Sequence, residues 1–392
     1  MVSLPVAYPI DPDGKRRRPI PYRRAVMNPM HLGVGKWSLS APLDESTLQI
    51  GEGWRIVFDG GPLPGYSGLI DMVDIAVGDD SDPRRGRTPP RVILSGPDDM
   101  TVLEERRVYP DPASVATSQA AAAYDERSGA ASTVLLGYID ANAASVALAD
   151  RQVPGLVTIA DPAIGASIAW KARFDPLLSK VVAPIAEQRG LRVWITSTTS
   201  GARTVHVAAV ANRAGKARFS LALGNLLSLR YRLAAPQATY VIAGGRGEED
   251  DRMFRAANNT SATAAWRRIE DFVDQRAASD TDGGTELQAA ADRRRDESGP
   301  VESVDIVPID TDRARFGVDW NVGDIIKAEI GMGSGVSVQA VVREAEITCE
   351  RARDRQVVTV RPKVGVLGTT SRSATERMLD DVLGRLGLLE RR

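Results

Sequence analysis

The sequence predicts a mostly β protein of the α+β class, in which two β-barrel-like domains flank an inserted α+β domain and a helix follows at the C-terminal end. Short apolar runs separated by Gly and Pro lie toward both ends of the chain, as in sandwiches and barrels. The middle is rich in Ala and has apolar residues at helical spacing. At roughly 100–200 residues per domain the chain allows about two to four domains. We place the boundaries at 1–108, 109–245, 246–300, 301–366 and 367–392.

The first predicted domain, residues 1–108, is β-rich. Three apolar segments, 54–58, 68–77 and 91–95, are predicted to be strands because each ends at Gly, Pro or a polar loop. The longest of these loops, 78–90, is rich in Asp, Arg and Pro.

The insert, residues 109–245, is predicted to mix helices and strands. Asp111-Pro112 supplies an N-cap residue and a first-turn Pro, which predicts a helix that runs to about Tyr124. A second helix is predicted at 133–143, and a third from Asp175, where apolar residues recur at helical spacing. Strands are predicted at 191–196, 204–210, 217–223 and 238–243.

The rest of the chain returns to β-structure after a polar stretch. Residues 246–300 are predicted to be a charged connecting region whose single helix begins at Thr285. Residues 301–366 form the second β-barrel-like domain in this prediction, with strands at 304–309, 338–342, 344–349 and 357–360.

The last segment, 367–392, carries the signals of a tethered amphipathic helix. Ser373 and Glu376 match a capping box, in which each side chain bonds a free backbone amide at the start of the helix. Leu379, Leu383 and Leu386 belong to the apolar stripe that follows. We expect these leucines to dock on a partner or a neighbouring subunit, with packing against their own chain as the alternative.

Composition excludes several functional classes. Lys and Arg number 50 against 51 Asp and Glu, so the chain lacks the basic excess of a nucleic-acid binder. The basic cluster at 15–18 is most simply a solvated arm. Cys349 is the only cysteine, so no intrachain disulfide can form, which fits assembly in a reducing cytoplasm. With no signal pattern and no long apolar run, we expect a soluble, unprocessed protein.

Candidate catalytic residues are few. The chain has two histidines, His31 and His206, which argues against a His-rich metal site, and no Gly-x-Ser-x-Gly elbow supports a triad at His206. The Gly-rich segment 244–247 lacks the Lys-Ser/Thr of a phosphate loop and leads into acidic residues. That acidic run could hold a divalent cation, but its spacing fits no calcium loop, so a solvated turn is preferred. We therefore predict no catalytic residue, cofactor or metal.

The segment 266–276 combines charge with aromatic residues. Three carboxylates in it could in principle do acid–base work. The adjacent arginines would keep them ionised, which suits salt bridges that fix register at a subunit interface. The predicted interface residues are Arg267, Arg268, Glu270, Asp271, Phe272, Asp274 and Arg276.

A series of short motifs resembles a known family. In order they are Asn28-Pro29 leading to Trp37, 39–47 before Gly53-Trp54, 192–195, 238–245, 268–276, Gly323-Asp324 and 360–362. By their order and spacing, the chain resembles the Gp37-like minor tail protein family of actinobacterial siphophages. That family is related in architecture to the tail-tip baseplate-hub (Tal-like) proteins of other long-tailed phages.

The resemblance implies a structural role in the virion. Three subunits would form a ring in which paired barrels mimic sixfold symmetry and adapt the sixfold tail tube to a threefold tip. The ring would contact the distal tail protein and the tape-measure protein, and would gate a channel through which DNA passes without specific binding. The family pattern supplies no catalytic residue.

Two other functions stay open at this stage. A tail-associated cell-wall hydrolase would need a constellation around His206 or the carboxylates near Asp271. A receptor-binding tail module would need an exposed aromatic groove, which Trp170, Trp194 or Trp266 could supply.

Overall fold

The computed structural model describes residues 3–77, 90–247, 251–276, 278, 283–308, 314–329, 337–351 and 356–365. The chain divides into a larger unit, Met1–Arg230 with Val304–Gly365, and a smaller unit that contains Tyr231–Ser303. Strand residues far outnumber helical residues in the described part of the chain, so the prediction of a mostly β, α+β protein is confirmed.

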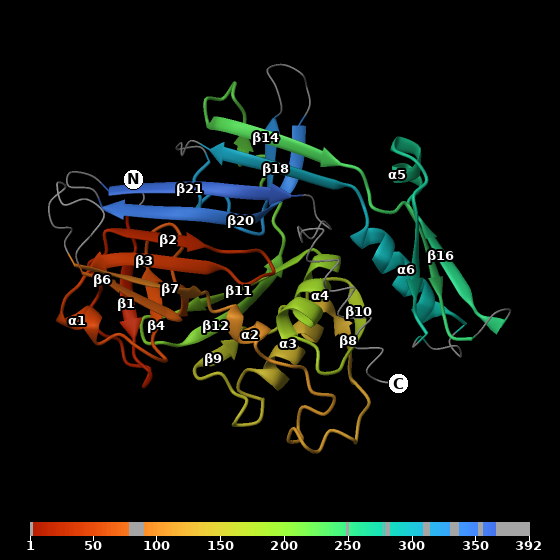
Figure 1. Ribbon diagram of the computed structural model, residues 1–392, viewed down its shortest axis with the longest axis horizontal. Coiled ribbons are helices and arrows are strands. Elements are labelled where there is room, and N and C mark those ends of the chain that lie inside the picture. The colour runs from red at the N-terminus through yellow and green to blue at the C-terminus, as the bar shows by residue number, and fades with distance from the viewer. Residues whose placement is uncertain are drawn as a thin grey trace. The chain divides into compact units, whose positions relative to one another are not determined.

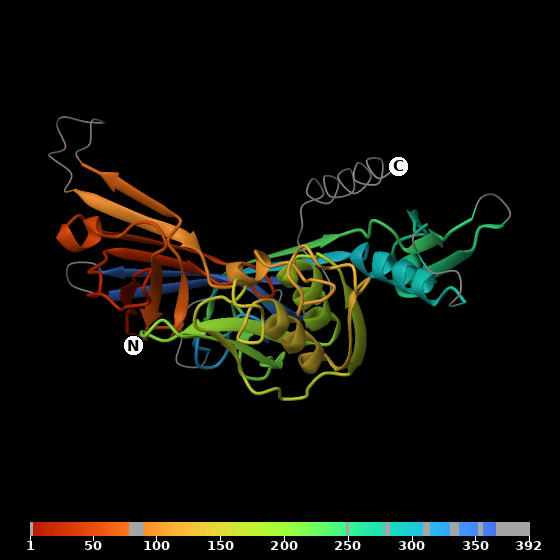
Figure 2. The same ribbon diagram turned by 90° about the horizontal axis from the view of Figure 1, so that it is seen from below.

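One ten-stranded sheet organises the larger unit, and its strands come from both ends of the chain. Met27 lies between Trp37 on one side and Ile347 on the other. Figures 1 and 2 show the N-terminal strands (red) beside the C-terminal ones (blue). The order along the sheet is β14 (Leu226–Ala234), β18 (Val301–Pro308), β21 (Gln356–Gly365), β20 (Ser337–Arg351), β2 (Arg24–Asn28), β3 (Lys36–Pro42), β7 (Arg91–Pro97) and β6 (Met72–Ala76), while β19 (Ile325–Glu329) pairs with β20 and with β13 (Arg218–Phe219).

The two regions predicted as separate barrel-like blocks therefore share one sheet. In the part of the chain that the structure describes, the sheets are open and none closes into a barrel. A second sheet, β1 (Val6–Ile10), β4 (Arg55–Asp59) and β5 (Tyr66–Leu69), contributes to the same core. Phe58 of β4 meets Trp37 of β3 edge-on, with ring centroids 6.0 Å apart.

Strand alternation explains why these segments pack as they do. In β3, Trp37, Leu39 and Ala41 are buried while Ser38 and Ser40 are half-buried. Apolar side chains on one face of a pleated strand exclude water from the core, and polar ones face outward. Two single-turn helices, α1 (Glu45–Leu48) and α2 (Thr101–Glu104), connect strands here, and the Asp44 carboxylate caps α1 by accepting from the Thr47 amide at 2.9 Å.

The inserted region forms its own hydrophobic core. The predicted helix at 133–143 is α3 (Ala131–Asn142), and the helix from Asp175 is a π-helical segment (Leu177–Val182) that continues into α4 (Ala183–Gln188). The predicted strands at 191–196 and 204–210 are β11 (Leu191–Ser197) and β12 (Arg203–Ala209). The remaining strands are β9 (Leu156–Thr158), parallel to β12, and the antiparallel pair β8 (Asp125–Ala130) and β10 (Ser167–Ala172).

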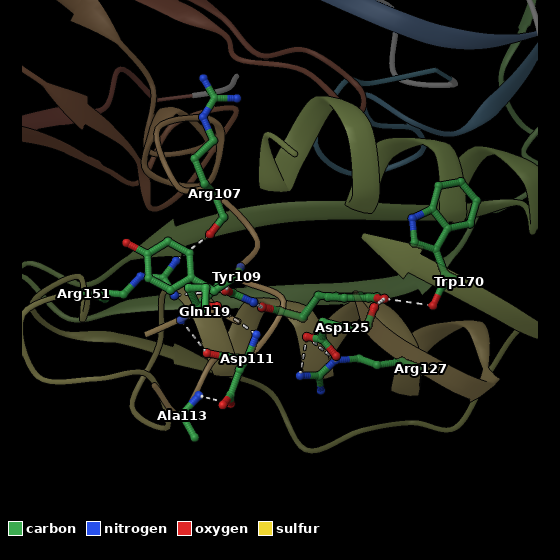
Figure 3. Close-up of polar contacts among 11 residues, drawn as sticks. Arg107, Tyr109, Asp111, Ala113, Gln119, Asp125, Arg127, Arg151 and Trp170 are labelled. Carbon is green, nitrogen blue, oxygen red and sulfur yellow. Dashed lines mark hydrogen bonds and ion pairs between the residues drawn. The ribbon is translucent and has the colours of Figure 1, made fainter. Parts of the chain in front are cut away.

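The helix predicted from Asp111 to Tyr124 is wrong, because this segment is an irregular loop. The Asp111 carboxylate accepts from the Ala113 amide at 3.2 Å, and the Gln119 amide bonds the Asp111 backbone in both directions (Figure 3). Such side-chain bonds compete with helical ones. Nearby, the Arg151 guanidinium stacks 3.5 Å from the Tyr109 ring centroid and ties the start of the loop to the insert.

The smaller unit is a three-stranded sheet backed by a helix. Its strands are β16 (Phe254–Asn258), β15 (Tyr240–Gly244) and β17 (Glu270–Asp274), in that order, with β15 and β17 parallel. The predicted helix at Thr285 is confirmed as α6 (Thr285–Glu297), and α5 (Thr260–Ala265) joins β16 to β17. Strands β16 and β17 were not predicted. The segment 367–392, with Leu379, Leu383 and Leu386, lies outside the described residues.

Candidate interaction surfaces

The main run of strands in the ten-stranded sheet ends at β6 and β14, which each pair on one side only within the described residues, as does the two-residue β13 on the branch through β19. Both present apolar side chains to solvent. In β6, Met72 is 53% and Ile75 is 45% exposed, and in β14, Leu227 is 68% and Leu233 is 50% exposed. An open strand edge with apolar neighbours is a template for pairing with another chain.

The charged segment predicted as an interface lies along β17 in the smaller unit. Arg268 Nε donates to Glu270 at 2.7 Å, and Arg276 Nε lies 3.3 Å from Asp274 Oδ2. Local arginines therefore pair with these carboxylates, and the role of the segment at a subunit interface stays a prediction. Arg267, Glu270, Phe272, Asp274 and Arg276 are exposed.

Sequence reasoning missed two arginines that come from outside the segment. Arg252, just before β16, donates to Asp274, and Arg294 Nε of α6 donates to Asp271 Oδ2 at 2.7 Å. Asp271 therefore contacts α6, the helix that packs on the buried face of this sheet. No local pattern could have signalled these partners, because they lie more than twenty positions away in the sequence.

The two histidines both lie near Arg192. His206 Nε2 lies 2.8 Å from Thr196 Oγ1, and its ring stacks on Trp194 at 5.1 Å. Burial, aided by Arg192, lowers the pKa of His206. His31 is more deeply buried, and burial together with Arg343 and Arg192 lowers its pKa to about 3. Neither ring has a carboxylate partner among the described residues.

The described residues contain no group of three or more His, Cys, Asp or Glu side chains that could hold a metal ion. An open depression of about 390 Å³ lies at the start of α6, and neither histidine lines it. Its lining residues are Arg255, Gly283, Gly284, Thr285, Gln288, Ala289 and Asp292.

A buried carboxylate pair at the end of β7 was also missed. Asp99 Oδ2 accepts from Arg55, and from Ser197 Oγ at 2.9 Å, so one oxygen joins β4 to β11 of the insert. Its neighbour Asp98 accepts from the Met100 amide, and burial raises the pKa of Asp98 to about 7. The sequence signal for this buried pair was the presence of two adjacent acids directly after an apolar strand. Acids at such a position more commonly lie in a solvated turn.

Comparison with known proteins identifies the family. Residues 10–365 match the family described as siphovirus ReqiPepy6 Gp37-like protein. The chain belongs to this family. The resemblance seen in the sequence motifs is therefore confirmed at the level of a siphovirus tail protein family. No curated protein matches the chain.

Three solved structures of tail proteins are similar to this Gp37-like chain. The 43 kDa tail protein of prophage MuSo2 from Shewanella oneidensis aligns with a TM-score of 0.56 at 11% identity, covering 92% of this chain and 98% of that one. A tail protein from Neisseria meningitidis MC58 gives 0.54 at 13% identity, over 93% and 98%. Prophage tail protein gp18 from Listeria monocytogenes EGD-e gives 0.51 at 8% identity, over 97% and 99%. At these identities the likeness establishes the fold.

The family membership makes the Gp37-like chain a phage tail component of the virion. Among the described residues, no helix is both long enough and apolar enough to span a membrane.

Proposed function

We propose that the Gp37-like chain is a non-enzymatic baseplate-hub subunit at the tip of the phage tail. Three copies form a ring that adapts the sixfold tail tube to a threefold tip and gates the channel for DNA ejection. The observation that carries this proposal is the pair of open, apolar edges, β6 and β14, at opposite ends of one sheet.

Two such edges on one chain complement each other. If β6 of one copy pairs with β14 of the next, each contact is heterologous, and a rotation that closes it makes a ring in which neither β6 nor β14 keeps a free edge. Leu227 and Leu233 would then be covered in every copy. An isologous dimer would join like edges and leave the other edge of each copy open.

The face of the sheet away from the core suits the wall of a water-filled channel. Cross-strand ion pairs join Lys363 to Glu344 at 3.0 Å, Arg361 to Glu346 at 3.7 Å and Arg24 to Glu350 at 3.4 Å. Positive charges that are already paired offer phosphates little gain in binding. DNA would therefore pass this face without being held.

The proposed neighbours are the distal tail protein, the tape-measure protein and other tail-tip proteins. Assembly would take place in the host cytoplasm. The charged residues of the smaller unit, Arg267 to Arg276, and the C-terminal leucines Leu379, Leu383 and Leu386 would contact sister subunits or these neighbours.

The assembly state tests the proposal. Native mass spectrometry of purified protein is expected to give a trimer. The double variant Leu227→Lys and Leu233→Lys places charges on the β14 edge and is expected to shift the population to monomer. Val146→Lys, at a site 73% exposed outside the sheet, is the matched control and should stay trimeric. A monomeric wild type, or a β14 variant that remains trimeric, would overturn the proposed ring with β6–β14 contacts.

A further inference from the structure

Arg203, the first residue of β12, is a buried arginine whose side chain has no hydrogen-bond partner among the described residues. The residue is only 6% exposed. Its Nε atom is enclosed and unpartnered, and its two Nη atoms, which retain some contact with solvent, donate to no described residue either. A guanidinium group carries five N–H donors, and leaving buried donors without an acceptor is unfavourable. Arg203 therefore needs acceptors that its described neighbours do not supply.

The sheet register directs Arg203 toward the buried pair of Arg55 and Asp99. Arg203 lies directly opposite Ser197 in the β11–β12 ladder, and opposite residues in a ladder project from the same face. The Ser197 hydroxyl joins the pair, because it donates to Asp99 Oδ2 and accepts from Arg55 Nη2, both at 2.9 Å. The other carboxylate oxygen, Asp99 Oδ1, is enclosed with no hydrogen-bond partner among the described residues. Two guanidinium groups and one carboxylate therefore lie together in the interior.

The charges of this group do not balance. Burial lowers the pKa of Arg203 to about 10, so its guanidinium group is still charged at pH 7. Burial acts to raise the pKa of Asp99, but Arg55 and Arg203 hold it below its ordinary value, so the carboxylate is ionised. The neighbouring Asp98 accepts from the Met100 amide and does not shift the pKa of Arg203. Two positive charges therefore share one negative charge, and an unbalanced charge in the interior is strongly unfavourable.

The burial and the excess charge define the ligand that fits. Water supplies acceptors but no charge, so it cannot balance the second guanidinium group. A polyvalent anion such as phosphate would carry more negative charge than the group lacks, and Asp99 would repel it. A small monovalent anion supplies both the acceptor and the single missing charge, and it needs little space beside a residue that is 6% exposed.

We propose that the Arg203 guanidinium group binds a small monovalent anion, such as chloride, beside the Arg55–Asp99 pair. The anion would accept from the Nη atoms of Arg203 and would cancel the excess charge of the group. Arg203 belongs to the insert and Arg55 to β4, so the anion would stabilise the same junction that Asp99 joins. The site lies within the larger unit and does not depend on the proposed ring.

Thermal unfolding of the full chain in two salts tests the anion site. Sodium chloride is compared with sodium gluconate at equal ionic strength, because gluconate is too bulky to reach Arg203 and screening is then the same. Chloride at about ten times its dissociation constant is expected to raise the wild-type Tm by about 2–4 °C, since a ligand of the folded state stabilises it. Arg203→Met keeps a long side chain without its charge and is expected to lose this shift. Arg24→Met, at an exposed ion pair, is the control and should retain it.

Diffraction from wild-type crystals with bromide in place of chloride locates the anion and does not depend on whether Arg203→Met folds. An anomalous peak within hydrogen-bond reach of the Arg203 guanidinium group is expected. Peaks on exposed arginines only, or Arg203 paired directly with Asp99 Oδ1 and no peak beside it, would overturn the proposal. Equal Tm values of the wild type in the two salts, or an equal chloride shift in wild type and Arg203→Met, would overturn it as well.

Discussion

Arg55 of β4 and Asp99, which follows β7, form an ion pair with both side chains less than a tenth exposed. The same carboxylate oxygen of Asp99 accepts hydrogen bonds from Ser67 of β5 and Ser197 of β11. Arg55 also donates to the Gly201 carbonyl at 3.2 Å. One carboxylate thus connects the N-terminal strands of the larger unit to the insert, and its loss would leave Arg55 without its buried counterion.

Asp99→Asn is expected to lower the free energy of unfolding by about 3–5 kcal/mol, because removing one partner strands a buried charge. Urea unfolding at pH 7 measures this. Arg268→Gln is the control, since both side chains of the Arg268–Glu270 pair are more than half exposed and such pairs contribute little to stability. Equal effects of the two substitutions would contradict the role assigned to Asp99.

Asp98 makes the free energy of unfolding depend on pH with the opposite sign to that of an acid whose pKa is lowered by an ion pair. Burial raises its pKa to about 7, so the folded state binds a proton that the unfolded state releases near pH 4. The contribution of Asp98 is complete below the unfolded pKa and is lost as the pH rises through about 7. Asp98→Asn should remove this loss and raise the free energy of unfolding at pH 8 by about 1–4 kcal/mol relative to wild type. Unfolding curves at pH 5 and pH 8 test this, and an Asn variant with the wild-type difference between them would count against it.

His31 contributes in the other direction. Its pKa falls to about 3 in the folded state because it is buried beside Arg343 and Arg192, whereas the unfolded value is near 6.5. Stability from neutral His31 is therefore present above pH 6.5 and is lost as the pH falls toward 3. His31→Gln should flatten the acid side of the stability profile between pH 6.5 and 4 and leave its alkaline side unchanged. A variant that retains the wild-type acid slope would show that another group causes it.

The elements that the sequence predicted are those in which the spacing of apolar residues along the chain matches the spacing of buried residues in the helix or strand. Helix α3 and strand β11 are examples, because their apolar residues repeat at 3.6 and 2 residues. Strand β1 escaped prediction because Pro9 interrupts it, although an edge strand tolerates Pro. Strand β17 escaped because charges lie on both of its faces. The β2–β20 pairing and the Arg55–Asp99 pair depend on contacts between distant segments, which a local pattern cannot reveal.

Gly68 of β5 is predicted to be intolerant of any side chain. A Cβ at this position would lie 2.1 Å from the Pro97 carbonyl oxygen and 2.5 Å from Trp37 Nε1. Neither atom can move freely, because Trp37 Nε1 donates to that carbonyl at 3.1 Å and Trp37 is buried in the core. Gly68→Ala must therefore separate β5 from β7 or break the Trp37 bond, at an expected cost of about 3 kcal/mol or more. Gly51→Ala is the control, since a Cβ there meets nothing within 4 Å. Thermal unfolding of the two variants should show a large drop in Tm for Gly68→Ala alone. A Gly68→Ala variant as stable as wild type would mean that β5 and β7 do not approach closely enough to exclude a Cβ.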